Sequence, residues 1–518
     1  MKPVRKLISY SILMLIAIIL LFMGGTWTYL VHQLPDMDAT LATPLITEKV
    51  SIIRDKWGVP HIQAANGNDA YFALGFTTAQ DRLFQMELQR CLAKGELAQI
   101  LGPKLTNVDK MFRTLLLKER AASYLAREQE INPEALQYLD SFLRGINQFI
   151  EEGPLPVEYT LLGFKPAPFT RLDTISMTGY VAYSFADGIK RDSLYTMLAP
   201  YLTRDDLKIV FPDYALENNV SIMEPAGNPT RSQPQTQTAS TGIDQNSYAG
   251  LATPLENILE QVAKIVPPFT GSNSWVLAPS RSQNGHALLA NDPHIGIANP
   301  GVWYEAHVKY PGYENYGYHL PLMPFPMLAH NGTKAWAITM FENDDLDLYG
   351  ETFNPENPNL VKFKGEWSPI ETITETIEVK GEPDEILTIR ITPHGPVISD
   401  FIKGYTGTPV ALSWVHHKVD SPFLDVVFEM GKADNLADFR QAVAKLSAPG
   451  LNISYIDSKG NIAWWAAGRV PIRPANVSGK QIHDGSSGKD ECLGYLPFES
   501  NPHLVNPDNG LIITANNI

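Results

Sequence analysis

Cysteine is scarce in this sequence of 518 residues, and only Cys91 and Cys492 occur. Two thiols cannot form the dense disulfide framework of a small secreted domain, and neither stands in a metal-binding spacing. Cys91 lies within a helical pattern, which predicts a small buried core residue and disfavours a bridge to Cys492. A chain of this length buries a large core without cross-links.

Blocks of lysine and arginine are also missing, and the formal net charge is −15 at pH 7. An acidic chain without a basic patch argues against nucleic acid as a partner. Apolar residues make up 44% of the chain and aromatic residues 10%, which is typical of a globular protein. No internal repeat of fixed period is present, which argues against a solenoid.

Long hydrophobic runs are absent except at the start of the chain. Lys2, Arg5 and Lys6 precede a charge-free run over residues 7–34. This order fits both a cleaved signal peptide and a retained membrane anchor, since the run reaches the ~20 residues that span a bilayer. We therefore assign residues 1–36 to a signal or anchor, and the positive flank places the body outside the cytoplasm. In a bacterial cell this predicts a periplasmic or membrane-anchored protein.

The Gly-x-Ser-x-Gly frame of an α/β-hydrolase does not surround Ser272, which argues against a triad serine hydrolase. Instead Gly271-Ser272-Asn273-Ser274-Trp275 stands at the start of an apolar, strand-like run. If the Gly271–Ser272 peptide is cut, Ser272 carries a hydroxyl and an α-amine on one residue. An α-amine has an ordinary pKa of about 7.7–8.0, so it can take the hydroxyl proton near neutral pH.

The first half of the chain is mostly helical in pattern. A turn at 56–58 separates two short strands, Asn68-Asp69 caps the next helix, and residues 106–215 are largely helical with a clear example over 134–151. Residues 225–250 are polar and poor in large apolar side chains, as in a linker. A short helix over 255–266 then leads to Pro267-Pro268.

The second half is rich in strand signals, with few helices such as 435–445, which together indicate a layered α+β body. The predicted strands cover residues 274–277, 287–290, 303–310, 334–339, 372–379, 385–392, 410–414, 453–457 and 462–466.

Several stretches, in one order, resemble the penicillin acylase family of N-terminal nucleophile hydrolases. They are Arg54-Asp55-Lys56-Trp57-Gly58-Val59-Pro60-His61-Ile62, Ala79-Gln80-Asp81-Arg82-Leu83-Phe84-Gln85-Met86, Gly271-Ser272-Asn273-Ser274-Trp275, Ala290-Asn291-Asp292-Pro293-His294, Pro393-His394-Gly395-Pro396-Val397 and Thr514-Ala515-Asn516-Asn517. The resemblance implies a four-layer αββα sandwich and a precursor that is cut before Ser272. It implies an α-chain over 37–225, a spacer over 226–271 and a β-chain from 272 to 518, which together form a heterodimer.

The resemblance also implies roles for single residues. Ser272 is the nucleophile, and its own α-amine is the base. Asn516 and the backbone N–H of Met340 match the two donors that stabilise the oxyanion. His294 matches a residue that orients the amine; without the resemblance, it is a loop histidine after Asp292-Pro293.

Substrate and metal residues follow in the same way. Ile295 and Leu328 stand where the penicillin G acylase branch has aromatic side chains, so we expect an aliphatic acyl pocket. Asp344, Leu346 and Asp347 match a structural Ca²⁺ site, with Asp345 beside them; a solvated acidic loop is the alternative. Asp187 and Asp192 are the candidates for a further acidic ligand, and no organic cofactor is implied.

The family usually continues well beyond the Asn516-Asn517 pair, whereas this sequence stops at Ile518, so we expect a truncated C-terminal part. The predicted activity is hydrolysis of the amide of an N-acylated small molecule, either a β-lactam side chain or an N-acyl homoserine lactone. The alternative is a non-catalytic, membrane-tethered protein that binds acylated ligands.

Overall fold

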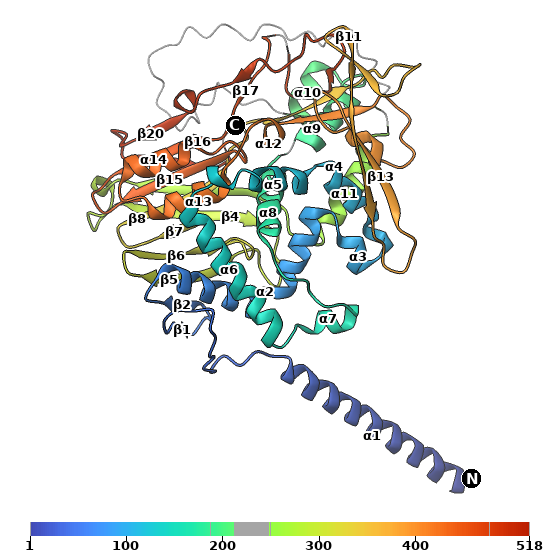
Figure 1. The fold of residues 1–518 in the computed structure, drawn as a ribbon, viewed down its shortest axis with the longest axis vertical. Helices are drawn as coiled ribbons and strands as arrows, with labels where there is room; N and C mark the ends of the chain where they lie inside the picture. The colour runs from blue at the N-terminus through green and yellow to red at the C-terminus, as the bar shows by residue number, and fades with distance from the viewer. Residues whose placement is uncertain (1, 187, 212–247, 249, 476, 517–518) are drawn as a thin grey trace.

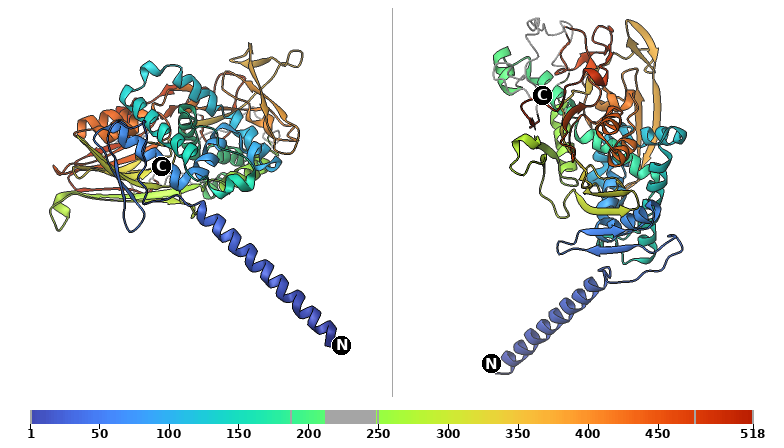
Figure 2. Two further views of the ribbon diagram at one scale, coloured as in Figure 1. Left: turned by 60° about the horizontal axis from the view of Figure 1, so that its bottom comes forward. Right: turned by 90° about the vertical axis from the view of Figure 1, so that its left-hand side faces the viewer.

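The computed structural model describes residues 2–186, 188–211, 248, 250–475 and 477–516. Helix α1 (Lys2–His32) projects away from the body in every view (Figures 1 and 2). Its segment Tyr10–His32 has a mean hydropathy of 2.1 and none of it is buried. By length and composition α1 could cross a membrane, and a signal sequence has the same properties.

The long helices α2 (Gly67–Lys94) and α6 (Pro133–Glu152) pack side by side. Asn66 caps α2 by accepting a hydrogen bond from the Asp69 N–H, so this helix begins one residue before the predicted cap at Asn68-Asp69. Asn132 caps α6 in the same way, and Pro133 occupies its first position, where a missing N–H costs nothing. Both helices were predicted from their apolar spacing.

The remaining helices are shorter and mostly border the same core. They are α3 (Leu97–Leu101), α4 (Thr106–Thr114), α5 (Leu117–Leu125), α7 (Val157–Leu162), α8 (Arg171–Ser184), α9 (Gly188–Leu198), α10 (Arg204–Val210), α11 (Ala252–Ala263), α12 (Val415–Lys418), α13 (Phe423–Lys432) and α14 (Leu436–Ala444). Asn435 caps α14, as the predicted helix over 435–445 requires. Cys91 is buried and unpaired, as expected.

A nine-stranded sheet has the order β1-β2-β5-β6-β7-β8-β15-β16-β20. Its strands are β1 (Ser51–Arg54), β2 (Pro60–Gln63), β5 (Tyr304–Tyr310), β6 (Tyr313–His319), β7 (Leu328–His330), β8 (Lys334–Met340), β15 (Leu451–Asp457), β16 (Ile462–Ala467) and β20 (His503–Val505). Among the described strands of this sheet only the pair β2–β5 is parallel, and it joins the predicted α-chain to the predicted β-chain.

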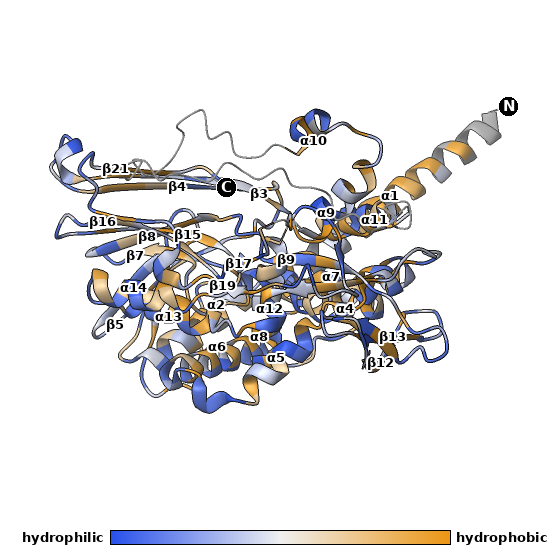
Figure 3. Cartoon of the chain, turned by 90° about the horizontal axis from the view of Figure 1, so that it is seen from above, coloured by the Kyte–Doolittle hydropathy of each residue, from blue (hydrophilic) through white to orange (hydrophobic). Residues whose placement is uncertain are grey.

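A second, three-stranded sheet has the order β21-β3-β4, with β3 (Phe269–Leu277), β4 (Leu288–Ile295) and β21 (Leu511–Thr514). It lies over β8, β15 and β16, and helices such as α2, α6 and α8 lie on the far side of the large sheet (Figure 3). Apolar side chains such as Val276, Ile512 and Trp464 fill the space between the two sheets. The described residues thus form an α+β body with the layers helix, sheet and sheet, and the fourth layer stays a prediction.

The remaining strands form small sheets beside the main body: β14-β9-β18, β12-β13, β10-β11 and β17-β19. Their bounds are β9 (Leu346–Gly350), β10 (Leu360–Phe363), β11 (Glu366–Pro369), β12 (Glu371–Ile377), β13 (Glu385–Ile391), β14 (Val410–Trp414), β17 (Pro471–Ile472), β18 (His483–Asp484) and β19 (Gly494–Tyr495). All the predicted strands are present, although β3 and β4 run further than expected. Half of the predicted spacer, residues 226–247 and 249, lies outside the described residues.

Candidate active site

Gly271 and Ser272 lie on β3, in the middle strand of the small sheet. The pairing of β3 with β4 shifts between Phe269 and Gly271, and Gly271 has φ = 149°. A side chain at this angle is strained, and a Cβ here would lie 3.0 Å from Nδ2 of Asn516. The backbone directly before Ser272 is therefore irregular, and only glycine fits it without strain.

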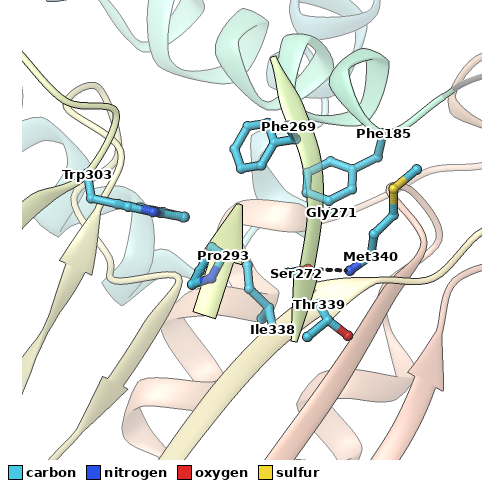
Figure 4. A pocket seen from close by; sticks show the side chains of 9 residues that line it. All are labelled: Phe185, Phe269, Gly271, Ser272, Pro293, Trp303, Ile338, Thr339 and Met340. Carbon is cyan, nitrogen blue, oxygen red and sulfur yellow. Dashed lines mark hydrogen bonds between the residues drawn. The ribbon is translucent and has the colours of Figure 1, made fainter. Parts of the chain in front are cut away.

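Ser272 meets two groups from distant parts of the chain. Its Oγ accepts a hydrogen bond from the Met340 N–H at 3.1 Å (Figure 4), and its own N–H donates to Oδ1 of Asn516 at 2.8 Å. Ser272 is only 6% exposed, so water does not compete strongly for these contacts. The structure thus brings together Ser272, Met340 and Asn516, which the sequence predicted as nucleophile and oxyanion donors.

The Met340 N–H can donate to Ser272 because strand β7 ends before it reaches Met340. Strand β7 is short and pairs with β8 only at Ala329–Trp336 and His330–Ala335. Met340 is the last residue of β8, beyond the reach of β7. A strand edge that lacks a neighbour presents free N–H groups, and β3 of the second sheet lies over this edge.

Asn516 reaches Ser272 through the register of β21. Thr514 pairs with Ser274, so two further residues bring the chain level with Ser272. Asn516 has φ = 56°, a left-handed conformation that asparagine adopts more easily than most residues. The choice of asparagine thus suits both the turn and the contact.

His294 does not meet Ser272. In the β3–β4 register Ser272 pairs with Pro293, whereas His294 pairs with Gly271. Because successive side chains alternate between faces, the His294 ring lies on the other face of this sheet, where Nε2 contacts Asp292 at 3.0 Å and Asn273 at 3.3 Å. In the uncut chain the geometry does not support contact of this ring with the nucleophile, and its role at a free amine stays a prediction.

A small cavity of about 10 Å³ opens beside Ser272, enough for about one water molecule. Its walls, drawn in Figure 4, are Phe185, Phe269, Gly271, Ser272, Pro293, Trp303, Ile338, Thr339 and Met340. The rings of Phe185 and Phe269 lie 5.0 Å apart, and Trp303 meets Phe269 edge-on at 6.3 Å. Three of the nine lining residues are therefore aromatic, beside the apolar Pro293, Ile338 and Met340.

Neither Ile295 nor Leu328, the residues expected to line an aliphatic pocket, borders this cavity, whose aliphatic walls are Pro293 and Ile338. Ile295 pairs with Phe269 at the far end of β4 and packs against the main core. Leu328 is buried on β7, which stops short of Met340. Phe269 could have been noticed in the sequence, since it is three residues before Ser272; Phe185 and Trp303 carry no local signal.

A larger cavity of about 330 Å³ adjoins the small one and shares Phe185, Phe269 and Met340 with it. Helix α11 contributes Leu259, Val262 and Ala263 to its wall. Because α11 precedes Gly271 in sequence, part of the wall of this cavity comes from the predicted spacer.

Arg82 fixes the segment that carries Trp303. Its guanidinium donates to the carbonyl of Gly301 at 2.9 Å and to that of Trp303 at 3.4 Å, and Gln85 donates to the same Gly301 carbonyl at 3.0 Å. The neighbouring Asp81 accepts from Arg54 and Tyr304, both at 2.8 Å. Two of the stretches that resemble the family therefore meet here and hold one wall of the small cavity.

The predicted metal residues lie beside this site, where two arginines surround them. Arg473 contacts Asp344 at 3.2 Å and Asp347 at 2.9 Å, and Arg191 contacts Asp344 at 2.6 Å. Burial opposes the charge of Asp347, but hydrogen bonds from His483 and Arg473 hold the pKa of this carboxyl below its ordinary value. These two carboxylates are thus already paired with cations.

The other predicted ligands do not complete a cage. Burial raises the pKa of Asp345 to about 7, and Leu346 lies in β9, paired with Trp414. Asp192 is buried 3.6 Å from Nε of Arg191 and accepts no hydrogen bond, while Asp187 lies outside the described residues. Over the described part of the chain, no three His, Cys, Asp or Glu side chains gather in a way that could hold a metal. The residues as arranged do not fit the six to eight oxygen ligands of Ca²⁺, which stays a prediction.

The chain belongs to the penicillin amidase family, whose model matches residues 49–518. It is 32% identical over 491 residues to penicillin acylase 2 proenzyme from Pseudomonas sp. (strain SE83), a match that covers 93% of this chain and 60% of the relative. It is 28% identical over 476 residues to acyl-homoserine lactone acylase QuiP from Pseudomonas fluorescens (strain Pf0-1), covering 91% and 56%.

Among solved structures, the thermostable penicillin G acylase from Alcaligenes faecalis in its orthorhombic form matches with a TM-score of 0.44 and 29% identity. That match covers 48% of this chain and 44% of the solved chain. The chain spans little more than half the length of the curated relatives it matches.

Proposed function

We propose that this protein is an amidohydrolase that cuts itself between Gly271 and Ser272 and then hydrolyses the amide bond of an N-acylated small molecule. The observation that carries the proposal is the position of Ser272, which follows a glycine at φ = 149° and accepts a hydrogen bond from the Met340 N–H. Both relatives named above are acylases, which favours an enzyme over the non-catalytic alternative.

The cut begins when Oγ of Ser272 attacks the Gly271 carbonyl and the peptide C–N bond breaks, leaving an ester and a free α-amine. Water then hydrolyses the ester, which gives a Gly271 carboxylate and restores the Ser272 hydroxyl. Glycine at position 271 favours this attack, because it lets the peptide take the irregular geometry, with φ = 149°, that a residue with a side chain rarely adopts. The side chain of Asn516 lies against this peptide.

Hydrolysis of the substrate uses the new terminus. The α-amine of Ser272 takes the proton of its own hydroxyl, and Oγ attacks the substrate carbonyl. The Met340 N–H and the Asn516 side-chain amide stabilise the oxyanion. The amine then gives the proton to the leaving amine, and water releases the acyl group from Ser272 by the same steps.

The substrate class is an N-acyl amine, either a β-lactam side-chain amide or an N-acyl homoserine lactone, in line with the names of the relatives. The small cavity beside Ser272, whose walls Phe185, Trp303 and Ile338 lie outside the predicted spacer, is the proposed entrance for the acyl group. We propose that the body is periplasmic, or membrane-anchored on the extracytoplasmic side, with α1 as its signal or anchor.

The two products of the cut would stay together as a heterodimer. β2 pairs with β5 in the large sheet, and α2 also contacts β5, so both chains share one core. A calcium ion and a fourth, helical layer are expected from the family, and both stay predictions. A chelation experiment on the wild type, described in the Discussion, addresses the calcium ion.

The direct test is Ser272→Ala, assayed for chain composition and for hydrolysis of a panel of acyl amides of different chain length. We expect a single uncut chain without activity. A control, Ser274→Ala, removes the next hydroxyl on the same side of β3 and should still be cut. Cutting at Gly271–Ser272 in the Ser272→Ala protein would refute the self-cleavage step, and activity of that protein would refute the acyl-serine step.

A further inference from the structure

The backbone carbonyl of Met340 accepts a hydrogen bond from a buried asparagine side chain. Nδ2 of Asn452 donates to the Met340 carbonyl at 2.7 Å, while the Met340 N–H donates to Ser272. Asn452 lies on β15, opposite Thr339 of β8, and is only 2% exposed. The side chain that fixes Met340 therefore comes from the neighbouring strand, in the layer between the two sheets.

The orientation of the Asn452 amide is set by a second side chain. Nε1 of Trp464 donates to Oδ1 of Asn452 at 3.0 Å. An indole N–H can only donate, so the Asn452 oxygen must face Trp464 and its NH₂ group must face Met340. Trp464 is 3% exposed and packs with Val276 of β3, which keeps the pair dry.

Met340 needs such a support because it ends its strand. The next residue, Phe341, bonds to the Gly450 carbonyl, and the chain then leaves the sheet toward Asp344, which has φ = 50°. β7 does not reach Met340, so among the described strands none pairs with it on that side. On the other side Met340 pairs with Leu451 of β15, and the Asn452 amide from the same strand adds a hydrogen bond to the Met340 carbonyl.

We propose that Asn452, oriented by Trp464, is a positioning residue that aims the Met340 N–H at the oxyanion formed on Ser272. The inference rests on the proposed function, in which this N–H is one of two oxyanion donors. Such donors act only within a narrow range of distance, about 2.7–3.1 Å, and a displacement of about 1 Å can cost 10²-fold in rate. Asn452 and Trp464 do not themselves touch the reacting atoms.

The test compares Asn452→Ala with Asn501→Ala in the full-length protein. Asn501 is a matched control: it is also 2% exposed, and it donates to two backbone carbonyls, Ala466 and Gly468, on the strand next to β15. We expect Asn452→Ala to lower kcat by 10- to 100-fold with KM within about twofold, and Asn501→Ala to leave kcat within about twofold. Equal kcat values for the two variants, at equal folded fraction, would overturn the proposal.

A second readout does not depend on turnover. Hydrogen exchange of a peptide covering residues 334–343 should be at least about 10-fold faster in Asn452→Ala than in Asn501→Ala, because the end of β8 loses its support. Trp464→Phe keeps an aromatic side chain but removes the indole N–H donor together with part of the ring volume, and we expect a three- to tenfold lower kcat. If Asn452→Ala does not fold, an unchanged kcat and exchange in Trp464→Phe would overturn the proposal.

These outcomes are distinct from failure of the proposed function. If the wild type neither cuts itself nor hydrolyses acyl amides, the proposed function fails before any variant is compared. If the wild type is active and Ser272→Ala is not, but Asn452→Ala matches the wild type in kcat and exchange, only the positioning role is refuted.

Discussion

Two polar clusters adjoin each other in the structure. One contains Ser272 and Met340 and the other contains Asp344 and Asp347, and their polar atoms have different kinds of partner. At Ser272 a strand-end N–H meets a neutral hydroxyl beside an irregular glycine. At Asp344 and Asp347, charged arginines already neutralise both carboxylates. The first cluster contains a hydroxyl and an N–H that can bond to a reacting atom. In the second cluster, the ion pairs between carboxylates and arginines stabilise the fold.

This difference predicts that the acidic cluster affects stability more than the nucleophile site does. Arg473 is 14% exposed and contacts both Asp344 and Asp347. Arg473→Ala leaves two carboxylates without their shared cation, and we expect the free energy of unfolding to fall by about 3–5 kcal/mol in chemical denaturation. The control Arg127→Ala breaks a largely exposed pair with Asp420 and should cost less than about 1 kcal/mol. Equal losses of unfolding free energy in Arg473→Ala and Arg127→Ala would show that the acidic cluster does not stabilise the fold more than an exposed ion pair does.

Chelation tests whether the acidic cluster depends on a metal ion. Carboxylates that are paired with arginines do not need a metal to balance their charge. We expect EDTA to leave the unfolding temperature of the wild-type protein unchanged. A fall in that temperature, restored by Ca²⁺, would show that a calcium ion binds despite the arginine contacts.

At the nucleophile site, Asn516→Ala removes one proposed oxyanion donor. We expect turnover to fall by about 10²–10³-fold, equivalent to about 2.7–4 kcal/mol, while mature chains still form. Asn506→Ala is the control, since Asn506 also has a left-handed backbone, with φ = 49°, but bonds to Ile462 far from Ser272. A rate within twofold of wild type would remove Asn516 from the site.

Phe185 lines both the small cavity at Ser272 and the larger one beside it. Phe185→Ala should join the two, and we expect kcat/KM for long acyl amides to rise about 10-fold relative to short ones. Ile189→Ala, on α9 and outside the predicted spacer, enlarges only the larger cavity and should leave this ratio unchanged. An unchanged ratio in Phe185→Ala would show that the acyl chain takes another path.

Much of this architecture could be predicted from the sequence, because apolar periodicity and caps are local signals. The helix over 134–151 and the strands at 334–339 and 453–457 were found in this way, and the resemblance located Ser272, Met340 and Asn516. Strand β6 was missed, since its Tyr-Glu-Asn-Tyr-Gly-Tyr-His alternates aromatic with polar residues and contains glycine.

The pocket and the residues that support the site were not predictable in this way. Phe185, Trp303 and Asn452 are separated from Ser272 by many residues, and only the tertiary packing of α8 and the two sheets brings them near the site. The face of His294 depends on the register of β3 against β4, which the motif alone does not fix. The pairing of Asp344 and Asp347 with Arg473 likewise depends on a contact between distant segments.

The central claim is that Ser272 works as a chain terminus. The most direct measurement is the intact mass and N-terminal sequence of an active preparation. We predict two chains, one of which begins Ser-Asn-Ser-Trp, with amide hydrolysis proportional to their amount. A single chain with Gly271 still joined to Ser272 that hydrolyses acyl amides at the full rate would contradict the account.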